Sequence, residues 1–360
     1  MPAWKVFHQD PHLTSSTEEF SILNEELTTF LRSKLRENVS IDGELRRMPG
    51  GFDTDTYSFS ITNAPDNFPT DLVLRYFRHA HETPRVVRES TVQNAAASGG
   101  HAVPSVPLDS TGVLLADRPF LIMERLPGTN LGDLLMKDES YVPLFPAIMA
   151  KLQAGLHRLD TTSLRKHLTE SGVDIEHMQP TRMLGAIEAI ANAAKLPDLR
   201  KLSRWLNGNY PDQPSNPSII HGDLHPMNIL MSDGKISGLI DWATSMFTHP
   251  EYDIAVSRTI LSIGPPEEIG IPKEEFEKML AWAVGEYMKE CHARQSLDDS
   301  LIDYYSALRM GHAYAKVLGK RHNVDLKFVA YEGYAWDRPD LYAFVTNIIG
   351  KTTGIALVSA

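Results

Sequence analysis

The sequence predicts an α+β protein with two lobes: an N-terminal lobe built on an antiparallel β-sheet with one inserted helix, and a larger, mainly α-helical C-terminal lobe. Strand-like segments dominate the first third of the chain, and helical periodicity dominates the rest. A length of 360 residues also exceeds what one small core serves. We place the boundary at the connector 124–128, and we expect lobes at 1–123 and 129–360 joined by a hinge there.

The strands of the N-terminal lobe are predicted by segments rich in β-branched and aromatic residues. An amphipathic helix precedes them over about 16–35, and a second helix over 85–97 is inserted after the third strand. The predicted strands cover 45–48, 54–61, 71–77, 111–115 and 120–123.

Two features of this lobe have both a functional and an ordinary interpretation. The Gly50-Gly51 turn lets backbone amides approach a phosphate, or it only closes a hairpin. Arg75 on the third strand and Glu89 on the inserted helix form an ion pair that positions a phosphate, or they are exposed surface charges. The residues alone leave both questions open.

The C-terminal lobe is predicted to be helical on both sides of one strand-rich stretch, residues 219–254. Apolar residues at helical spacing over 276–291 include the only cysteine, Cys291, which we therefore interpret as a core residue. The predicted helices cover 142–159, 183–194, 199–206, 276–291 and 301–317.

The stretch 219–254 contains the residues that point to a reaction. Two short strands, 229–231 and 236–240, are joined by an Asp-Gly turn. A hairpin this short carries Asn228, before the first strand, to within a few ångströms of Asp241, after the second. With Asp223 nearby, these oxygen side chains suit Mg²⁺, whose shell is normally completed by phosphate oxygens. The stretch therefore predicts the active site of a phosphotransferase.

The composition limits which binding partners and which cellular compartment we expect for the protein. The formal net charge of −11 argues against nucleic acid or an anionic membrane as the main partner. A single cysteine excludes an internal disulfide and suits a reducing compartment. The chain also has no run of roughly 18 apolar residues. We expect a cytoplasmic protein that binds neither nucleic acid nor membrane; the sequence does not decide its oligomeric state.

The spacing His221-Gly222-Asp223-Leu224-His225-Pro226-Met227-Asn228, followed by Leu239-Ile240-Asp241-Trp242, resembles the aminoglycoside phosphotransferase/choline kinase family. That family is a branch of the protein-kinase-like fold. The resemblance extends from Met48 to about Ile254, and the last hundred residues match only as generic helices. It implies a bilobal protein-kinase-like fold and a small-molecule kinase with an alcohol group as acceptor.

The resemblance also implies roles for individual residues. Asp223 accepts the proton of the attacking hydroxyl, while Asn228 and Asp241 hold Mg²⁺ against the phosphates of ATP or GTP. His221 and Asp253 are expected to brace the site without reacting. The expected nucleotide contacts come from Gly50 and Gly51 over the phosphates, Arg75 with Glu89 beside them, and backbone groups of Glu124 and Leu126 at the adenine edge. The expected partners are thus a nucleotide and a small hydroxyl-bearing substrate.

Two positions depart from the family pattern. Arg75 stands where a phosphate-binding Lys is common, and guanidinium geometry differs from that of an ammonium group. Ala243 follows Ile240-Asp241-Trp242, where an acidic residue is frequent. The first departure leaves phosphate binding feasible. The second means that any metal or substrate contact made by an acid at that position in relatives is missing here.

Two other functions remain as alternatives. His221, Asp223 and His225 are all potential zinc ligands of a metallohydrolase, although Gly222 and Pro226 would break the required helix. A kinase-like protein that binds nucleotide without catalysis is the other alternative.

The acceptor is open among aminoglycosides, macrolides, choline or ethanolamine, sugars and amino-acid alcohols. Four acids lie either in a polyamine pocket or on solvated helix faces: Glu251, Asp298, Asp299 and Asp303.

Overall fold

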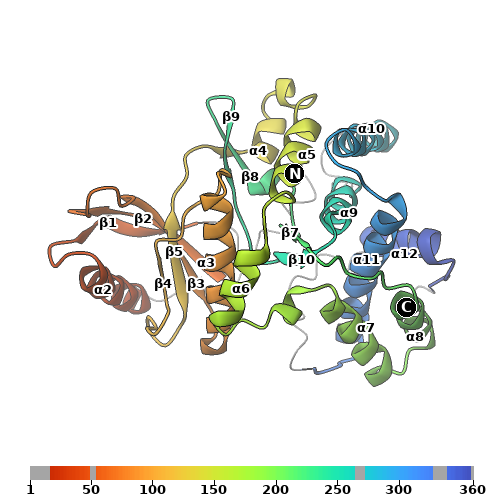
Figure 1. Ribbon diagram of the computed structural model, residues 1–360, viewed down its shortest axis with the longest axis horizontal. Helices are drawn as coiled ribbons and strands as arrows, with labels where there is room; N and C mark the ends of the chain where they lie inside the picture. The colour runs from red at the N-terminus through yellow and green to blue at the C-terminus, as the bar shows by residue number, and fades with distance from the viewer. Residues whose placement is uncertain (1–16, 49–53, 264–271, 327–338, 358–360) are drawn as a thin grey trace.

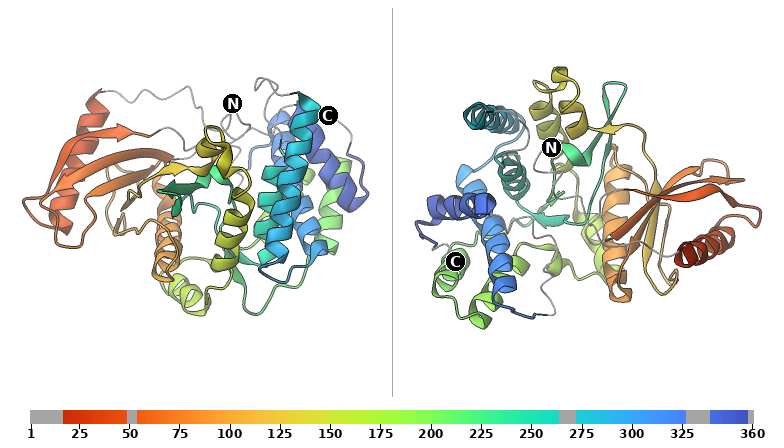
Figure 2. Two further views of the ribbon diagram at one scale, coloured as in Figure 1. Left: turned by 90° about the horizontal axis from the view of Figure 1, so that it is seen from above. Right: turned by 180° about the vertical axis from the view of Figure 1, so that it is seen from behind.

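The computed structural model describes residues 17–48, 54–263, 272–326 and 339–357 of the chain. It consists of a sheet-containing lobe and a larger helical lobe that lie next to each other along the long axis of the molecule (Figure 1). The views from above and from behind show the same separation (Figure 2). The predicted fold class is confirmed.

The small lobe contains a five-stranded sheet in the order β1-β2-β3-β5-β4, with antiparallel neighbours throughout. Its elements are α2 (Thr17–Lys34), β1 (Ser40–Arg47), β2 (Thr54–Thr62), β3 (Asp71–Phe77), α3 (Thr83–Ser98), β4 (Leu108–Asp109) and β5 (Phe120–Glu124). Helix α3 is the predicted inserted helix.

Alternation along β3 directs one row of side chains to each covering helix, because successive residues of a strand point to opposite faces. Leu72, Leu74 and Tyr76 belong to the core that α2 closes on the outer face. Phe77 instead packs with Val86 of α3, on the face toward the large lobe. Arg75 shares the parity of Phe77, so the register of one strand aims its guanidinium at α3.

The predicted strand over 111–115 is wrong. The fourth strand is the two-residue β4, and a turn follows it, in which Gly112, Ala116 and Asp117 have φ of 80°, 40° and 62°. Three left-handed residues interrupt the extended backbone that a strand requires. The Gly50-Gly51 turn lies outside the described residues.

The large lobe is mainly helical. Its helices are α4 (Leu131–Leu135), α5 (Phe145–Leu156), α6 (Thr162–Glu170), α7 (Thr181–Ala193), α8 (Pro197–Gly208), α9 (Pro250–Leu261), α10 (Lys273–His292), α11 (Asp299–Arg321) and α12 (Pro339–Thr353). Its strands are β6 (Thr129–Asn130), β7 (Ser218–Ile220), β8 (Ile229–Ser232), β9 (Lys235–Leu239) and β10 (Met246–Thr248). β7 pairs with β10, and β6, β8 and β9 form a second small sheet.

The predicted helix over 142–159 is longer than α5, which begins at Phe145 and ends at Leu156. Pro146 fixes that start, since proline is tolerated in the first helical turn and not deeper. Helices α4, α6, α9 and α12 are not among the predicted ones.

The cores explain how the lobes are joined. Val92 and Ala96 of α3 belong to the large hydrophobic core of the helical lobe, while Val86 of the same helix packs under the sheet. Cys291 is buried in the large core, as predicted. In the described part of the chain, no helix is both long and apolar enough to cross a bilayer.

Candidate active site

The β8–β9 hairpin brings together the residues that the sequence singles out. Ile229 pairs with Leu239, and the amide of Ile240 donates to the carbonyl of Asn228 at 2.9 Å. Asn228 is therefore a direct neighbour of the segment that carries Asp241. This geometry agrees with the prediction made from the short Asp-Gly turn.

Asp241 ends this hairpin with an unusual backbone conformation. Its φ is +67°, in the left-handed region, where Asp is one of the few side chains tolerated. Its carboxylate is 47% exposed. The backbone thus turns out of the strand at Asp241 and leaves one carboxylate open to a ligand.

The loop between β7 and β8 holds Asp223 and depends on a glycine. Gly222 has φ of +80°, and a Cβ placed there would lie 2.5 Å from the carbonyl oxygen of Thr244. The hydroxyl of Thr244 donates to the carbonyl of His221 at 3.1 Å. The loop and the segment after Asp241 are therefore in close backbone contact, and only glycine fits between them.

His221 connects the two acids through their backbones. Its Nδ1 accepts from the amide of Asp223 at 3.3 Å, and its Nε2 donates to the carbonyl of Ile240 at 3.0 Å. Burial lowers the pKa of His221, although the carboxylates of Asp253 and Asp223 act in the opposite direction. A neutral imidazole with both nitrogens hydrogen-bonded braces the loop, as expected, and has no lone pair left for zinc.

Asp253 supports the same loop from α9. Its two oxygens accept from the amides of Gly222 and His221 at 2.8 and 3.3 Å, and Oδ2 lies 3.1 Å from Nε2 of His157. Burial opposes ionisation of Asp253, but His157, His221 and the Gly222 amide outweigh it and lower the pKa. A buried carboxylate thereby fixes the start of the loop.

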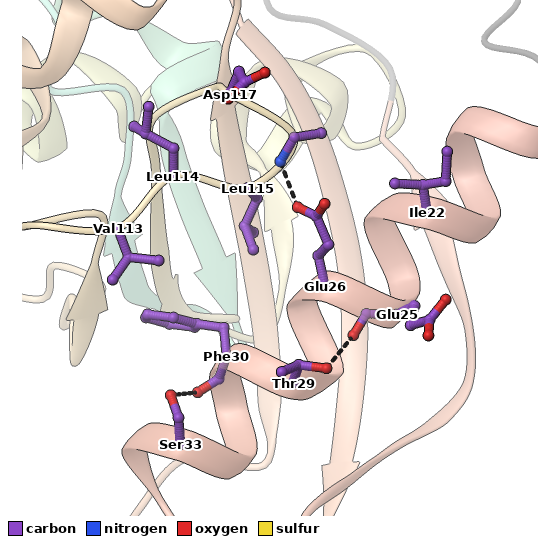
Figure 3. A pocket seen from close by; sticks show the side chains of 11 residues that line it. Ile22, Glu25, Glu26, Thr29, Phe30, Ser33, Val113, Leu114, Leu115 and Asp117 are labelled. Atoms are coloured by element: carbon purple, nitrogen blue, oxygen red, sulfur yellow. Dashed lines mark hydrogen bonds between the residues drawn. The ribbon is translucent and has the colours of Figure 1, made fainter.

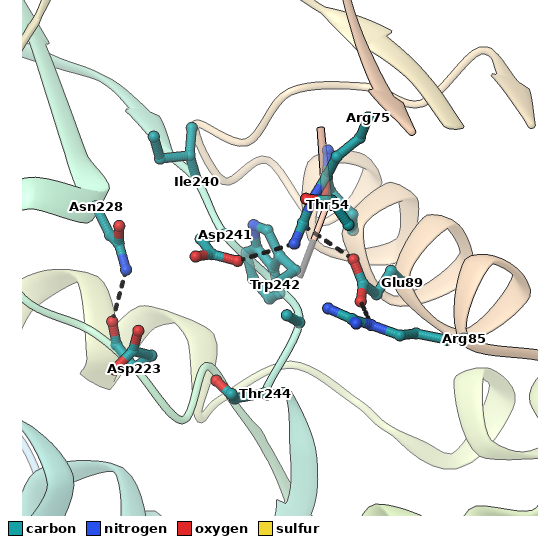
Figure 4. Close-up of polar contacts among 12 residues, drawn as sticks. Thr54, Arg75, Arg85, Glu89, Asp223, Asn228, Ile240, Asp241, Trp242 and Thr244 are labelled. Carbon is teal, nitrogen blue, oxygen red and sulfur yellow. Dashed lines mark hydrogen bonds and ion pairs between the residues drawn. The ribbon is translucent and has the colours of Figure 1, made fainter. Parts of the chain in front are cut away.

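Asp223 is partly exposed in this loop, and Figure 4 shows it below Asn228. Its Oδ2 is 3.6 Å from Nε2 of His225, and its carbonyl accepts from Nδ2 of Asn228 at 2.9 Å. Burial alone would raise the pKa of Asp223, but His225 and the charge of Arg309 lower it to about 2. The carboxylate is therefore ionised at neutral pH.

Arg75 joins the small lobe to this site. Its Nη1 donates to Oε2 of Glu89 at 2.9 Å, and its Nη2 lies 3.4 Å from Oδ1 of Asp241 (Figure 4). Glu89 is fully buried and Arg75 nearly so. Of the two interpretations of this pair, the structure supports a buried bridge to the hairpin and not two surface charges.

Glu89 has two further cationic neighbours, which the sequence analysis missed. Nε of Arg85 donates to it at 2.6 Å, and Nη2 of Arg88 lies 3.8 Å away. Burial would raise the pKa of Glu89, but the three guanidinium groups lower it. The signal for Arg85 was its position four residues before Glu89, which places both on one helix face.

Arg88 makes the longest-range of these contacts. Its Nη2 donates to the backbone carbonyl of Ala243 at 2.9 Å, which ties α3 to the segment after Asp241. Burial lowers the pKa of Arg88 to about 10. Position 243, where the acidic side chain of some relatives is missing, thus contributes its carbonyl to holding the two lobes together.

The connector 124–128 follows the edge of the site. The amide of Glu124 donates to Ser105, whereas the amide of Leu126 has no hydrogen-bond partner among the residues that the structure describes. Gly128 has φ of +118°, and a Cβ there would meet the carbonyl of Met231 at 2.3 Å. The connector is therefore pressed against β8 at Gly128, while the amide of Leu126 remains available as a donor.

The side chains at this site fit a magnesium ion better than a zinc ion. Carboxylate and amide oxygens of Asp241 and Asn228 are hard ligands of the kind that Mg²⁺ prefers. Within the described ranges, no three His, Cys, Asp or Glu side chains are close enough together to hold a metal. An ion bound here would depend on further oxygens, such as those of phosphate, to complete its shell.

A separate hollow lies on the small lobe, between α2 and the turn at 113–117 (Figure 3). The carboxylate of Glu26 crosses it to accept from the amide of Ala116. None of its lining residues belongs to the loop, the hairpin or the Arg75 bridge. It is distinct from the candidate active site.

Comparison with known proteins decides the family. Residues 44–285 match the model of the phosphotransferase enzyme family, which is more than half of the chain. The chain belongs to this family. The protein is accordingly a transferase of the phosphotransferase class with a protein-kinase-like fold, and the match includes every candidate residue of the site.

Proteins of known structure share the fold of this phosphotransferase. A crystal structure of a proposed aminoglycoside phosphotransferase from Ralstonia eutropha matches with a TM-score of 0.60 and 18% identity, over 92% of this chain and 97% of that one. An aminoglycoside phosphotransferase in ternary complex with ADP and hygromycin B matches with a TM-score of 0.55 and 16% identity, over 89% and 98%.

A match by sequence comes from a much longer protein. Acyl-CoA dehydrogenase family member 11 of Rattus norvegicus is 29% identical over 180 residues, which are 48% of this chain and 22% of that protein. The match therefore spans about a fifth of the relative's length.

Proposed function

We propose that the protein transfers the γ-phosphate of ATP or GTP to a hydroxyl group of a small molecule. The observation that carries the proposal is the convergence of Asp223, Asn228 and Asp241, with Arg75 bridging from the small lobe. The loop, hairpin and α3 fix these groups through backbone contacts. Positioning of this kind is most of what a loose phosphoryl-transfer transition state requires.

In this proposal the nucleotide lies between the lobes, next to the connector 124–128. The structural relative that contains ADP supports the choice of nucleotide, and the unpaired amide of Leu126 offers a donor to the base. Arg75 contacts the phosphates, while Asn228 and Asp241 hold Mg²⁺. A bound magnesium ion would neutralise charge on the β- and γ-phosphate oxygens.

Asp223 receives the acceptor hydroxyl. As the hydroxyl oxygen forms a bond to the γ-phosphorus, the bond from that phosphorus to the β–γ bridging oxygen breaks, and the nucleoside diphosphate leaves. The hydroxyl proton passes to Asp223. A carboxylate with a pKa of about 2 is a weak base, so its main contribution is to orient the hydroxyl and to take the proton late.

The test is phosphate transfer by the purified full-length protein. We expect incubation with ATP, Mg²⁺ and a panel of hydroxylated small molecules to release ADP and to produce one phosphorylated acceptor, detected by its added mass. EDTA should abolish the product. Nucleotide binding without any product over a broad panel would instead support a non-catalytic, kinase-like protein.

A further inference from the structure

A row of basic side chains follows one face of α11. Between Tyr304 and Gly319, every residue is buried except Arg309, His312 and Lys316. Their spacing of three and four residues places them on a single face of the helix. Between Tyr304 and Gly319, the accessible positions of α11 are therefore an arginine, a histidine and a lysine.

Arg182 joins this row from a neighbouring helix. It is the second residue of α7, which packs against α11. Burial lowers the pKa of Arg182, and the charges of Arg309 and Arg85 act in the same direction, whereas Tyr252 opposes them. A cation in the first turn of a helix also opposes the helix dipole. Desolvation, two like charges and the helix dipole therefore all disfavour the charged form of Arg182.

Arg182 and Arg309 have no compensating acids among the residues that the structure describes. In the described parts of the chain, neither Arg182 nor Arg309 has a carboxylate within ion-pair distance or a side-chain hydrogen bond. Nδ1 of His312 is buried without a hydrogen-bond partner there. Like charges gathered without counter-ions destabilise a protein, and a bound anion would offset this cost.

The row lies near the proposed active site, with helix α9 as the link. Oη of Tyr252 in α9 donates to Sδ of Met183, next to Arg182, at 3.5 Å. Asp253, next to Tyr252, accepts from the amide of Gly222, next to Asp223, at 2.8 Å. The charge of Arg309 also contributes to the lowered pKa of the Asp223 carboxyl. Arg182 acts in the same way on Arg88, whose guanidinium contacts the carbonyl of Ala243 beside the hairpin. The groups proposed for the nucleotide lie on β3 and the hairpin, whereas Arg182 and Arg309 come from α7 and α11. Both helices belong to the large lobe, whose helix α9 also holds the loop of Asp223.

The acids that a polyamine substrate would need are used elsewhere. Glu251 is buried and accepts from the amide of Asp298 at 3.1 Å. Asp298 caps α11 through the amide of Ser300 at 2.8 Å. Asp303 pairs with Arg258 at 2.7 Å, and Asp299 lies 3.1 Å from His292. A polycation would therefore find these carboxylates engaged.

We propose that the acceptor of this phosphotransferase is an anionic molecule whose carboxylate or phosphate group binds to Arg182, Arg309 and His312, with its hydroxyl at Asp223. The inference rests on the proposed function and specifies its substrate class. It separates this protein from family members whose acceptor is a polycation such as hygromycin B.

One arm of the test is a matched acceptor panel. Glycerol 3-phosphate and 3-hydroxybutyrate are compared with the neutral glycerol and 1,3-butanediol and with the cationic choline and hygromycin B. We expect ADP release only with anions. Arg182→Gln and Arg309→Gln should raise the acceptor KM at least about tenfold, as for a lost charged hydrogen bond, and leave the KM for ATP within about twofold. Arg204→Gln, at an exposed arginine of α8, should change neither.

The second arm does not depend on finding the acceptor. Orthophosphate or acetate, added with saturating ADP and Mg²⁺, should raise the Tm of the wild-type protein and not that of the Arg182→Gln/Arg309→Gln double variant. Stabilisation by phosphate alone points to a phosphorylated acceptor, and stabilisation by acetate to a carboxylated one.

The outcomes separate the two proposals. Turnover of choline or hygromycin B that is insensitive to Arg309→Gln would overturn the anionic acceptor and preserve the phosphotransferase. Wild-type protein that neither anion stabilises, and that phosphorylates no anionic compound, would also overturn it. A protein that binds neither ADP nor ATP in the presence of Mg²⁺ would overturn the phosphotransferase itself.

Discussion

At the scale of single residues, the site depends on side chains that each contact two other side chains. Arg75 is the clearest case, because one guanidinium reaches both Glu89 and Asp241, at 2.9 and 3.4 Å. A planar fork can hold two partners in fixed directions, whereas an ammonium group is a single point of charge. The arginine at the position where lysine is common therefore acts as a bridge between α3 and the hairpin.

This bridge predicts that the conservative exchange is not neutral. We expect Arg75→Lys to raise the KM for ATP by about tenfold, since one of the two charged contacts is lost. Steady-state kinetics with varied ATP measures the effect, and Arg204→Lys, at the exposed position of α8, serves as the control. An unchanged KM for ATP would mean that the bridge does not bear on nucleotide binding.

At the scale of elements, the loop and the hairpin are held by close backbone approach. Gly222 and Gly172 provide a matched pair, with φ of +80° and +78°. A Cβ at Gly222 meets the carbonyl of Thr244, whereas at Gly172 it meets nothing within 4 Å. Comparing the two positions therefore separates the effect of the close contact with Thr244 from the effect of the left-handed backbone.

Alanine at each glycine therefore has a different expected effect. Gly172→Ala should lower the free energy of unfolding by about 1–2 kcal/mol, the cost of a left-handed alanine. Gly222→Ala should lower it further and should also reduce turnover, because the carbonyl of Thr244 must move. Urea titration and turnover measure both effects. Equal losses at the two positions would show that the close approach is unimportant.

At the scale of the whole molecule, buried titratable groups link stability to pH. The folded pKa of His221 is lowered chiefly by burial, and that of His312 is lowered well below its usual value. The pKa values of Glu89, Asp223 and Asp253 are lowered by their cationic and hydrogen-bonding partners, against the effect of burial. For every one of these groups the unfolded chain binds protons more readily, so stability decreases as pH falls.

The Tm should therefore decrease in two stages on acidification. The first begins at about pH 6.5, where the histidines of the unfolded chain become protonated, and the second at about pH 4, where its carboxyls do. Calorimetry from pH 8 to pH 3 measures both. A Tm that rises between pH 7 and pH 5 would contradict the assignment of His221 and His312 as neutral in the folded protein.

The sequence predicted the part of the site that is local in the chain. The spacing of Asp223, Asn228 and Asp241 depends on one loop and one short hairpin, so residue types and turn chemistry were sufficient. The contact of Arg88 with Ala243 spans 155 positions and follows from how α3 packs, for which the sequence has no periodic signal. The placement of Arg182 and Arg309 on neighbouring helices depends in the same way on how α7 packs against α11.

The fold class followed from the change between strand and helix patterns, whereas details set by backbone conformation did not. The turn at 111–115 contains β-compatible residues, but left-handed conformations at Ala116 and Asp117 end any strand there. The division into lobes at 124–128 remains a proposal, since α3 contributes to the cores on both sides.

One isosteric exchange tests most directly whether Asp223 orients the acceptor hydroxyl and takes its proton. Asp223→Asn keeps the size of the side chain and removes the base, while Asp233→Asn makes the same exchange at the exposed hairpin turn. We expect Asp223→Asn to bind ATP with nearly wild-type affinity and to lose phosphate transfer, and Asp233→Asn to retain both. Transfer by Asp223→Asn within a few-fold of the wild-type rate would contradict the account.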